Sequence, residues 1–146
     1  MSNGYETYRS VNVDTAGQGK LILIAYDVAI KHCKLAVPMF GSARSIEERT
    51  RHLFKAQDAI SELMGALRLD VGDIGRNLYR IYDYMLRSLV EANVKDSGTK
   101  VQEIITHLET LRDAWCEAIE NVKKEAQPRH SAVGAVPQQT GFAVSG

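Results

Sequence analysis

Two glutamates each precede a histidine by four positions, and these pairs are the first candidates for metal or acid–base chemistry. They are Glu48 with His52 and Glu103 with His107. A helical di-metal carboxylate site uses Glu-x-x-His, a spacing of three, on two helices, with further carboxylates pointing inward. Neither pair has that spacing or those additional acids. The sequence therefore predicts no metal site, no cofactor and no catalytic residues of this kind.

A histidine can also accept a phosphoryl group, which makes a histidine phosphotransfer module the nearest enzymatic alternative. His32 and His107 lie in helical stretches, but neither is followed by the small residues and lysine that would make room for an incoming domain. Gly17, Gly19 and Lys20 lack the spacing of a phosphate-binding P-loop, and no nucleophile elbow occurs. We expect a protein that is not an enzyme and keep the phosphotransfer module as an alternative.

Composition and charge narrow the class of partner. Basic and acidic residues balance at 18 each and are interleaved along every helical stretch, which disfavours a nucleic-acid partner. The longest apolar run is residues 21–26, far shorter than the roughly 20 residues of a membrane span. The first fifteen residues lack the apolar core of a signal peptide. We therefore expect no membrane insertion and a cytoplasmic location, with another protein as the partner.

The stretch from Gly19 to Val37 carries more apolar surface than a helix of a small bundle needs to bury. A surface helix has one apolar stripe, roughly 100° wide. Here there are two: a first stripe of Ile22, Tyr26, Ala29, Cys33 and Ala36, and a second stripe of Leu21, Ile24, Val28 and Leu35. This helix is either central in its fold or presents its second stripe to a partner.

The remaining periodicity predicts an all-α fold, an antiparallel up-down four-helix bundle. Further helices are expected from Ser45 to about Leu69, from Asp73 to about Val94 and from Thr99 to about Glu125. Ser45 with Glu48 and Thr99 with Gln102 have the spacing of capping boxes, and Asp73 is expected to be an N-cap. The fourth helix should turn Trp115, Ala118, Ile119 and Val122 inward, and both cysteines, Cys33 and Cys116, should be buried small hydrophobes.

Three domain segments follow from these patterns. Residues 1–16 show no helical period and are predicted to be a flexible N-terminal arm, with Tyr5 and Tyr8 as small apolar anchors. Residues 17–126 form the helical bundle. Residues 127–146, rich in Pro, Gly, Ser, Ala and Gln, are predicted to be a disordered tail. Tyr84, an aromatic residue among Arg80, Arg87 and Glu91, either contacts a partner or lies over neighbouring side-chain stems.

Several segments resemble the flagellin export chaperone family, FliS, in order and spacing across nearly the whole helical region. They are YETYRSVNV (5–13), TAGQGKLILIAYDVAI (15–30), KAQDAISEL (55–63), LYRIYDYMLRSLVEANVK (78–95) and LRDAW (111–115). The family commonly has Thr-Ala-Ser-Pro where this chain has Thr15-Ala16-Gly17-Gln18, and Asp-Gly where it has Asp27-Val28. The second difference adds bulk to the second stripe of the first helix.

The resemblance implies an antiparallel helical bundle that acts as a cytoplasmic export chaperone. It would bind the disordered C-terminal region of flagellin, prevent premature polymerisation and deliver the client to the flagellar type III export gate. An unrelated helical adaptor is the other alternative. Weak self-association of the free protein through its apolar groove is also expected. The candidate partner-binding residues are Tyr5, Tyr8, Leu21, Ile24, Val28, Tyr82, Tyr84, Met85 and Leu89.

Overall fold

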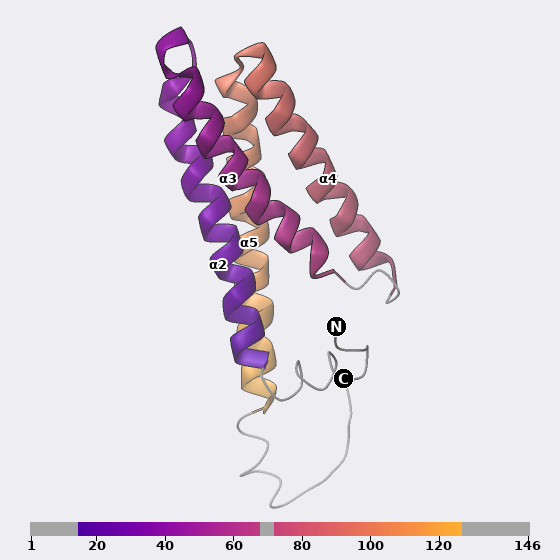
Figure 1. The fold of residues 1–146 in the computed structure, drawn as a ribbon. Helices are drawn as coiled ribbons and strands as arrows, with labels where there is room; N and C mark the ends of the chain where they lie inside the picture. Colours follow the sequence, from indigo (N-terminus) through magenta and orange to yellow (C-terminus); the bar gives the residue numbers. More distant parts are fainter. Residues whose placement is uncertain (1–14, 68–71, 127–146) are drawn as a thin grey trace, which may run out of the picture.

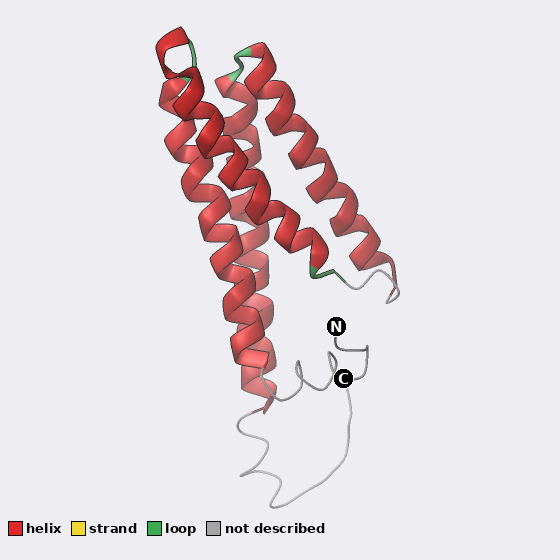
Figure 2. Ribbon diagram, in the orientation of Figure 1, coloured by secondary structure: helices red, strands yellow, loops and turns green. Residues whose placement is uncertain are grey.

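The computed structural model describes residues 15–67 and 72–126, and within them the chain is a helical bundle without strands (Figures 1 and 2). The four long helices are α2 (Thr15–Ala36), α3 (Ile46–Gly65), α4 (Gly72–Lys95) and α5 (Gly98–Ala126). Two short 3-10 turns, η1 (Val37–Met39) and η2 (Ala43–Ser45), connect α2 to α3. The predicted all-α bundle is confirmed. Residues 1–14 of the predicted arm and the whole predicted tail lie outside the described residues.

Each helix packs on two neighbours, so the four helices form a ring. α2 contacts α3 and α5, and α4 contacts the same two helices. Figure 1 shows α2 and α5 running side by side past the ends of α3 and α4. The close approach of α2 and α5 needs a glycine, because a Cβ added at Gly19 would lie 2.9 Å from the Cδ1 atom of Ile119.

This extension corrects the prediction that the end of α5 faces a four-helix core. Ala118 is exposed and Val122 is 44% exposed, while Trp115 and Ile119 are only partly buried. The reason is geometric: the last turns of α5 run past the ends of α3 and α4, so among the described helices α2 alone lies beside them.

The first stripe of α2 forms the centre of the core, as predicted. Tyr26, Ala29, Cys33 and Ala36 are completely buried, and Ile22 packs against the core from its edge. The Tyr26 hydroxyl is hydrogen-bonded to that of Tyr82 on α4. The side chain of Trp115 on α5 lies near both hydroxyls and opposes the rise in their pKa that burial causes. Two polar groups can therefore be buried here because each has a partner.

Removing one hydroxyl of this pair should destabilise the bundle. Tyr82→Phe leaves the Tyr26 hydroxyl buried with one partner fewer, which we expect to cost about 1–2 kcal/mol of unfolding free energy. Urea denaturation of the two proteins measures this difference. Tyr79→Phe is the matched control, because Tyr79 is 42% exposed on the same helix and should change stability by less than about 0.5 kcal/mol. Equal stability of all three proteins would show that the Tyr26–Tyr82 contact contributes nothing.

The predicted helix caps are wrong in detail. Ser45 occupies the N-cap position of α3 but makes no side-chain capping hydrogen bond. Asp73 lies inside the first turn of α4, which begins at Gly72. Thr99 lies inside α5, whose first turn is capped instead by Ser97: its Oγ accepts a hydrogen bond from the Lys100 backbone N–H at 3.4 Å. The starts of α4 and α5 thus shift by one or two residues. Two predicted bounds differ more: α2 begins at Thr15, inside the predicted arm of residues 1–16, and α3 ends at Gly65 and not at about Leu69.

A buried arginine links α3 to α4 at the end of the bundle that holds both the α2–α3 and the α4–α5 connections. Arg49 is 3% exposed. Its Nε and Nη2 donate to the side-chain and backbone oxygens of Asn93 at 2.9 and 3.0 Å, and its Nη1 donates to Asp96 Oδ1 at 2.9 Å. The guanidinium also lies 4.4 Å from the ring centre of Phe40.

Asp96 joins the two connections at this end. Its Oδ1 atom also accepts the backbone N–H of Gly41 at 2.9 Å. Its own φ is +55°, a left-handed conformation that aspartate tolerates better than most residues. One carboxylate thus ties the loop after α4 to the loop after α2 and to Arg49.

Candidate functional site

The second stripe of α2 is exposed among the described residues, so this helix is not buried on both of its apolar faces. Leu21, Ile24 and Val28 are 63%, 46% and 37% exposed, and Leu35 is 41% exposed. Large aliphatic side chains repeated along one helix face at this exposure form a patch rather than scattered surface residues. The second stripe is therefore not core in this structure.

Ion pairs on the other side of α2 help to orient this stripe. Asp27 accepts a hydrogen bond from Arg112 of α5 at 2.6 Å, and Lys34 pairs with Glu109 of α5 at 3.0 Å. Both pairs are partly exposed to water, so each contributes little to stability. They place the polar wedge of α2 against α5 and leave the apolar stripe beside α3.

A groove of about 460 Å³ runs along this stripe between α2 and α3. Its α2 wall is Leu21, Ile24, Ala25, Val28 and His32, and its α3 wall is Lys55, Asp58, Ala59 and Glu62. We call this the α2/α3 groove. One wall is mainly apolar and the other carries both signs of charge, a combination that suits an amphipathic segment rather than a small polar molecule.

Two histidines meet at one end of the α2/α3 groove. The Nδ1 atoms of His32 on α2 and His52 on α3 are 2.9 Å apart, a hydrogen-bond distance, and the ring centres are 5.2 Å apart. The Nε2 atom of His52 lies 3.9 Å from the Glu48 carboxylate. Burial lowers the pKa of His32 below its ordinary value, and the nearby charges of His52, Lys31 and Lys55 lower it further.

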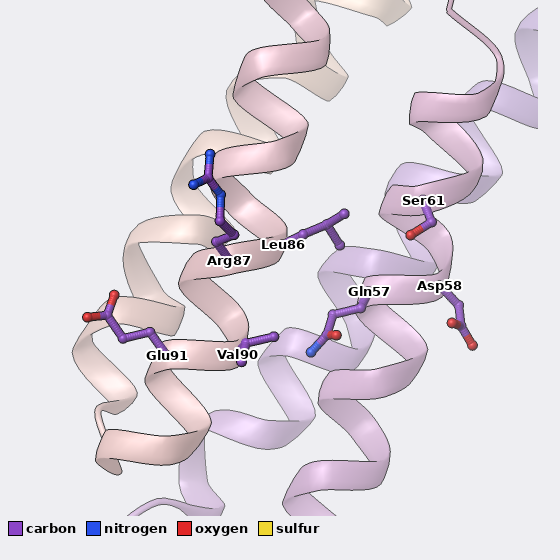
Figure 3. A pocket seen from close by; sticks show the side chains of 7 residues that line it. All are labelled: Gln57, Asp58, Ser61, Leu86, Arg87, Val90 and Glu91. Atoms are coloured by element: carbon purple, nitrogen blue, oxygen red, sulfur yellow. The ribbon is translucent and has the colours of Figure 1, made fainter.

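The α3/α4 groove lies on the adjoining face of α3, and Asp58 lines both grooves. Its volume is about 400 Å³, and it is lined by Gln57, Asp58, Ser61, Leu86, Arg87, Val90 and Glu91. Figure 3 shows Leu86 and Val90 of α4 and Gln57 of α3 directed into the space between the helices. Fewer large apolar side chains line it than line the α2/α3 groove, so we treat it as secondary.

Three of the candidate partner-binding residues on α4 need correction. Tyr82 is 1% exposed, and Met85 and Leu89 are completely buried. They lie on the face of α4 that packs into the core, so they cannot touch a partner while the bundle is closed. We do not include them in the candidate surface. Tyr5 and Tyr8 lie outside the described residues.

Tyr84 is exposed, but it is not part of the α2/α3 groove. It is 46% exposed on α4, and Lys100 of α5 places its Nζ atom 5.7 Å from the ring centre and 3.4 Å from the hydroxyl. The ring therefore has a cation of α5 beside it, a contact that does not decide between the two alternatives drawn from the sequence. Neither α4 nor α5 lines the α2/α3 groove.

The described residues offer little for metal or transfer chemistry. Across 15–67 and 72–126, no three His, Cys, Asp or Glu side chains gather where they could hold a metal ion. His32 is engaged by His52, and His107 stands exposed on α5. In the same part of the chain, no helix has the length and apolar character needed to cross a membrane.

No pattern within a single helix indicated the contact between His32 and His52, or the charged wall of the groove. The two histidines are 20 positions apart on different helices, and only the register between α2 and α3 brings them together. The amphipathic pattern of the second helix placed Lys55, Asp58 and Glu62 towards water without showing that they border the apolar stripe. Finding them from the sequence would have required a prediction of the axial register between α2 and α3.

Comparison with known proteins agrees with this architecture. A family model described as "Flagellar protein FliS" matches residues 1–122. The flagellar secretion chaperone FliS of Bacillus subtilis (strain 168) is 32% identical over 134 residues, covering 92% of this chain and 97% of that protein. Those of Vibrio cholerae and Salmonella typhimurium are each 27% identical, over 79% and 78% of this chain and 88% of either relative. The chain thus belongs to the FliS family of flagellar secretion chaperones.

Proposed function

We propose that this protein is a cytoplasmic chaperone that binds the disordered C-terminal region of flagellin in the α2/α3 groove. By covering that region it would prevent premature polymerisation, and it would deliver the client to the flagellar type III export apparatus. The observation that carries the proposal is the exposed row of Leu21, Ile24 and Val28 beside α3, in a chain of the FliS family.

The dimensions of the groove suit a short helix. From Leu21 to His32 is 11 positions, which at 1.5 Å per residue corresponds to about 16 Å, or three helical turns. A client helix of that length presents apolar side chains at i, i+3 or i+4, and i+7 to one face. Those side chains would cover the exposed parts of Leu21, Ile24 and Val28, and burial of apolar area contributes roughly 25 cal/mol per Å².

The charged wall would set the orientation of the client. Lys55 is followed one and two turns later by Asp58 and Glu62, so the groove has a basic end beside His32 and an acidic end beside Leu21. A client with acidic residues towards the first end and basic residues towards the second would match it. Such exposed charges favour one orientation and one set of partners more than they add affinity.

The N-terminal arm and the export gate complete the proposal. Tyr5 and Tyr8 would cover apolar surface of the bundle when no client is bound, and would contribute to docking at the export gate. Without the client, the exposed stripe would also favour weak self-association. Sedimentation of the free protein and of a variant lacking residues 1–14 tests whether the arm covers apolar surface and whether the exposed stripe causes self-association. The truncated protein should associate more strongly.

Calorimetric titration with a flagellin C-terminal fragment is the direct test of the proposed function. The fragment is expected to be disordered when free, so binding must both order it and bury its apolar face. We therefore expect a favourable enthalpy opposed by entropy, and a negative heat-capacity change across a series of temperatures. An N-terminal flagellin fragment of equal length is the control and should not bind. No heat of binding with either fragment would overturn the proposal.

A further inference from the structure

The contact between His32 and His52 is an unusual feature of the α2/α3 groove. The nitrogen atoms are 2.9 Å apart while the ring centres are 5.2 Å apart, and the ring planes differ by only 27°. Because the nitrogens are so much closer than the centres, the rings meet edge to edge through Nδ1. In such a contact one Nδ1 must carry the hydrogen and the other must accept it.

This geometry tolerates one added proton but not two. A proton added to His52 leaves His32 as the acceptor, and the new imidazolium gains the Glu48 carboxylate 3.9 Å from its Nε2. A second proton places an N–H on both facing atoms. The hydrogen bond is then lost and two positive charges oppose each other across the interface of α2 and α3.

The neighbouring charges make that second proton more costly. The charged groups facing the pair are Lys31 on α2, and Glu48 and Lys55 on α3, while Asp58 lines the groove one turn beyond Lys55. Burial, His52 and the two lysines all lower the pKa of His32. With a lowered pKa in the folded state, the unfolded chain binds more protons, so this stabilisation is complete above about pH 6.5 and falls away as pH drops below it.

We propose that the His32–His52 contact makes occupancy of the α2/α3 groove depend on pH, with a bound apolar segment released when both imidazoles are protonated. His32 lines the same groove as Leu21, Ile24 and Val28, so separation of the two rings changes the end wall of the site. It also places a charge beside the apolar client, which raises the cost of burial. This inference rests on the proposed function for the identity of the client.

Calorimetry with the flagellin C-terminal fragment at several pH values provides the first test. The wild-type affinity should fall about two- to fivefold between roughly pH 7.5 and pH 5.5, the effect over this range of one unit of pKa difference between the free and the bound protein. His32→Asn keeps a hydrogen-bonding amide near the position of Nδ1 but cannot acquire the charge. Whatever its affinity at the higher pH, this variant should lose most of the pH dependence.

His107→Asn is the control, because His107 is exposed on α5 away from the groove. It should retain the full wild-type pH dependence. If wild-type affinity does not change with pH, or if His32→Asn shows the same decline as the wild type, the inference is wrong. A fragment that fails to bind at every pH contradicts the proposed function instead.

NMR of the free protein distinguishes a failure of the pH inference from a failure of the proposed function. The imidazole nitrogen signals of His32 should move as the pH falls, and the methyl signals of Ile24 and Val28 should shift over the same pH range. His32→Asn should remove these methyl shifts. Titration of His32 with groove methyl signals that do not move would overturn the coupling even if the fragment is never captured.

Discussion

Replacing Ile24 by glutamate should abolish binding of the flagellin C-terminal fragment while leaving the melting temperature of the bundle nearly unchanged. Ile24 is 46% exposed and lines the α2/α3 groove, so the free protein keeps the carboxylate hydrated. In the complex, the same carboxylate would be buried against an apolar client. We expect affinity to fall about 100-fold or more, roughly 3 kcal/mol, because a buried charge without a partner is strongly unfavourable.

A matched substitution on another helix controls for the added charge. Val122 on α5 is 44% exposed, close to the value for Ile24, and does not line the groove. Val122→Glu should therefore bind the fragment like the wild type. Leu21→Glu should behave like Ile24→Glu. If both glutamate variants of α2 bind at full strength with unchanged stability, the client does not use this groove.

The largest loss of stability away from the apolar core is expected for Arg49→Ala. Arg49 joins α3 to the end of α4 through three hydrogen bonds and lies over the ring of Phe40. Its removal leaves the side-chain oxygen of Asn93 and the Asp96 carboxylate without their charged donor. Asp96 is half exposed and regains water, so we expect about 2–4 kcal/mol of destabilisation rather than the cost of a stranded buried ion.

Urea denaturation measures this loss of unfolding free energy, and two further variants serve as comparisons. Arg51→Ala removes an exposed arginine from the same helix and should change stability by less than about 0.5 kcal/mol. Arg49→Lys keeps the charge but cannot form the same fork of hydrogen bonds, so it should lie between the wild type and Arg49→Ala. A loss below about 1 kcal/mol for Arg49→Ala would show that the two connections are held by other contacts.

Helical periodicity was sufficient to predict the fold, because burial in a bundle repeats with the helix itself. The two stripes of α2 show this directly: Tyr26 and Cys33 are buried, while Ile24 and Val28 are exposed. The pattern left open whether the second stripe is buried as well, since both stripes are apolar. Among the described residues, the other long helices cover the first stripe and leave part of the second exposed.

The candidate site was harder to predict than the fold, for two physical reasons. Tyr82 and Met85 share one broad apolar face of α4, and a single such face in a bundle is used for packing before it is available to a partner. The His32–His52 contact depends on the axial register of α2 against α3, which no repeat within either helix encodes. A rise of 1.5 Å per residue means that a shift of one turn would separate the rings.

The burial of Cys33 makes its thiol a probe for the opening of this bundle. Its side chain is completely buried in the first stripe, and burial raises the pKa of its thiol to about 12. The thiolate is the form that attacks alkylating reagents, so in the closed bundle Cys33 is protected twice, by the absence of solvent and by its proton. Cys116 on α5 is only partly buried. Alkylation should therefore modify Cys116 rapidly and Cys33 only when α2 separates from the core. The ratio of the two modification rates would report the free energy of that opening under native conditions.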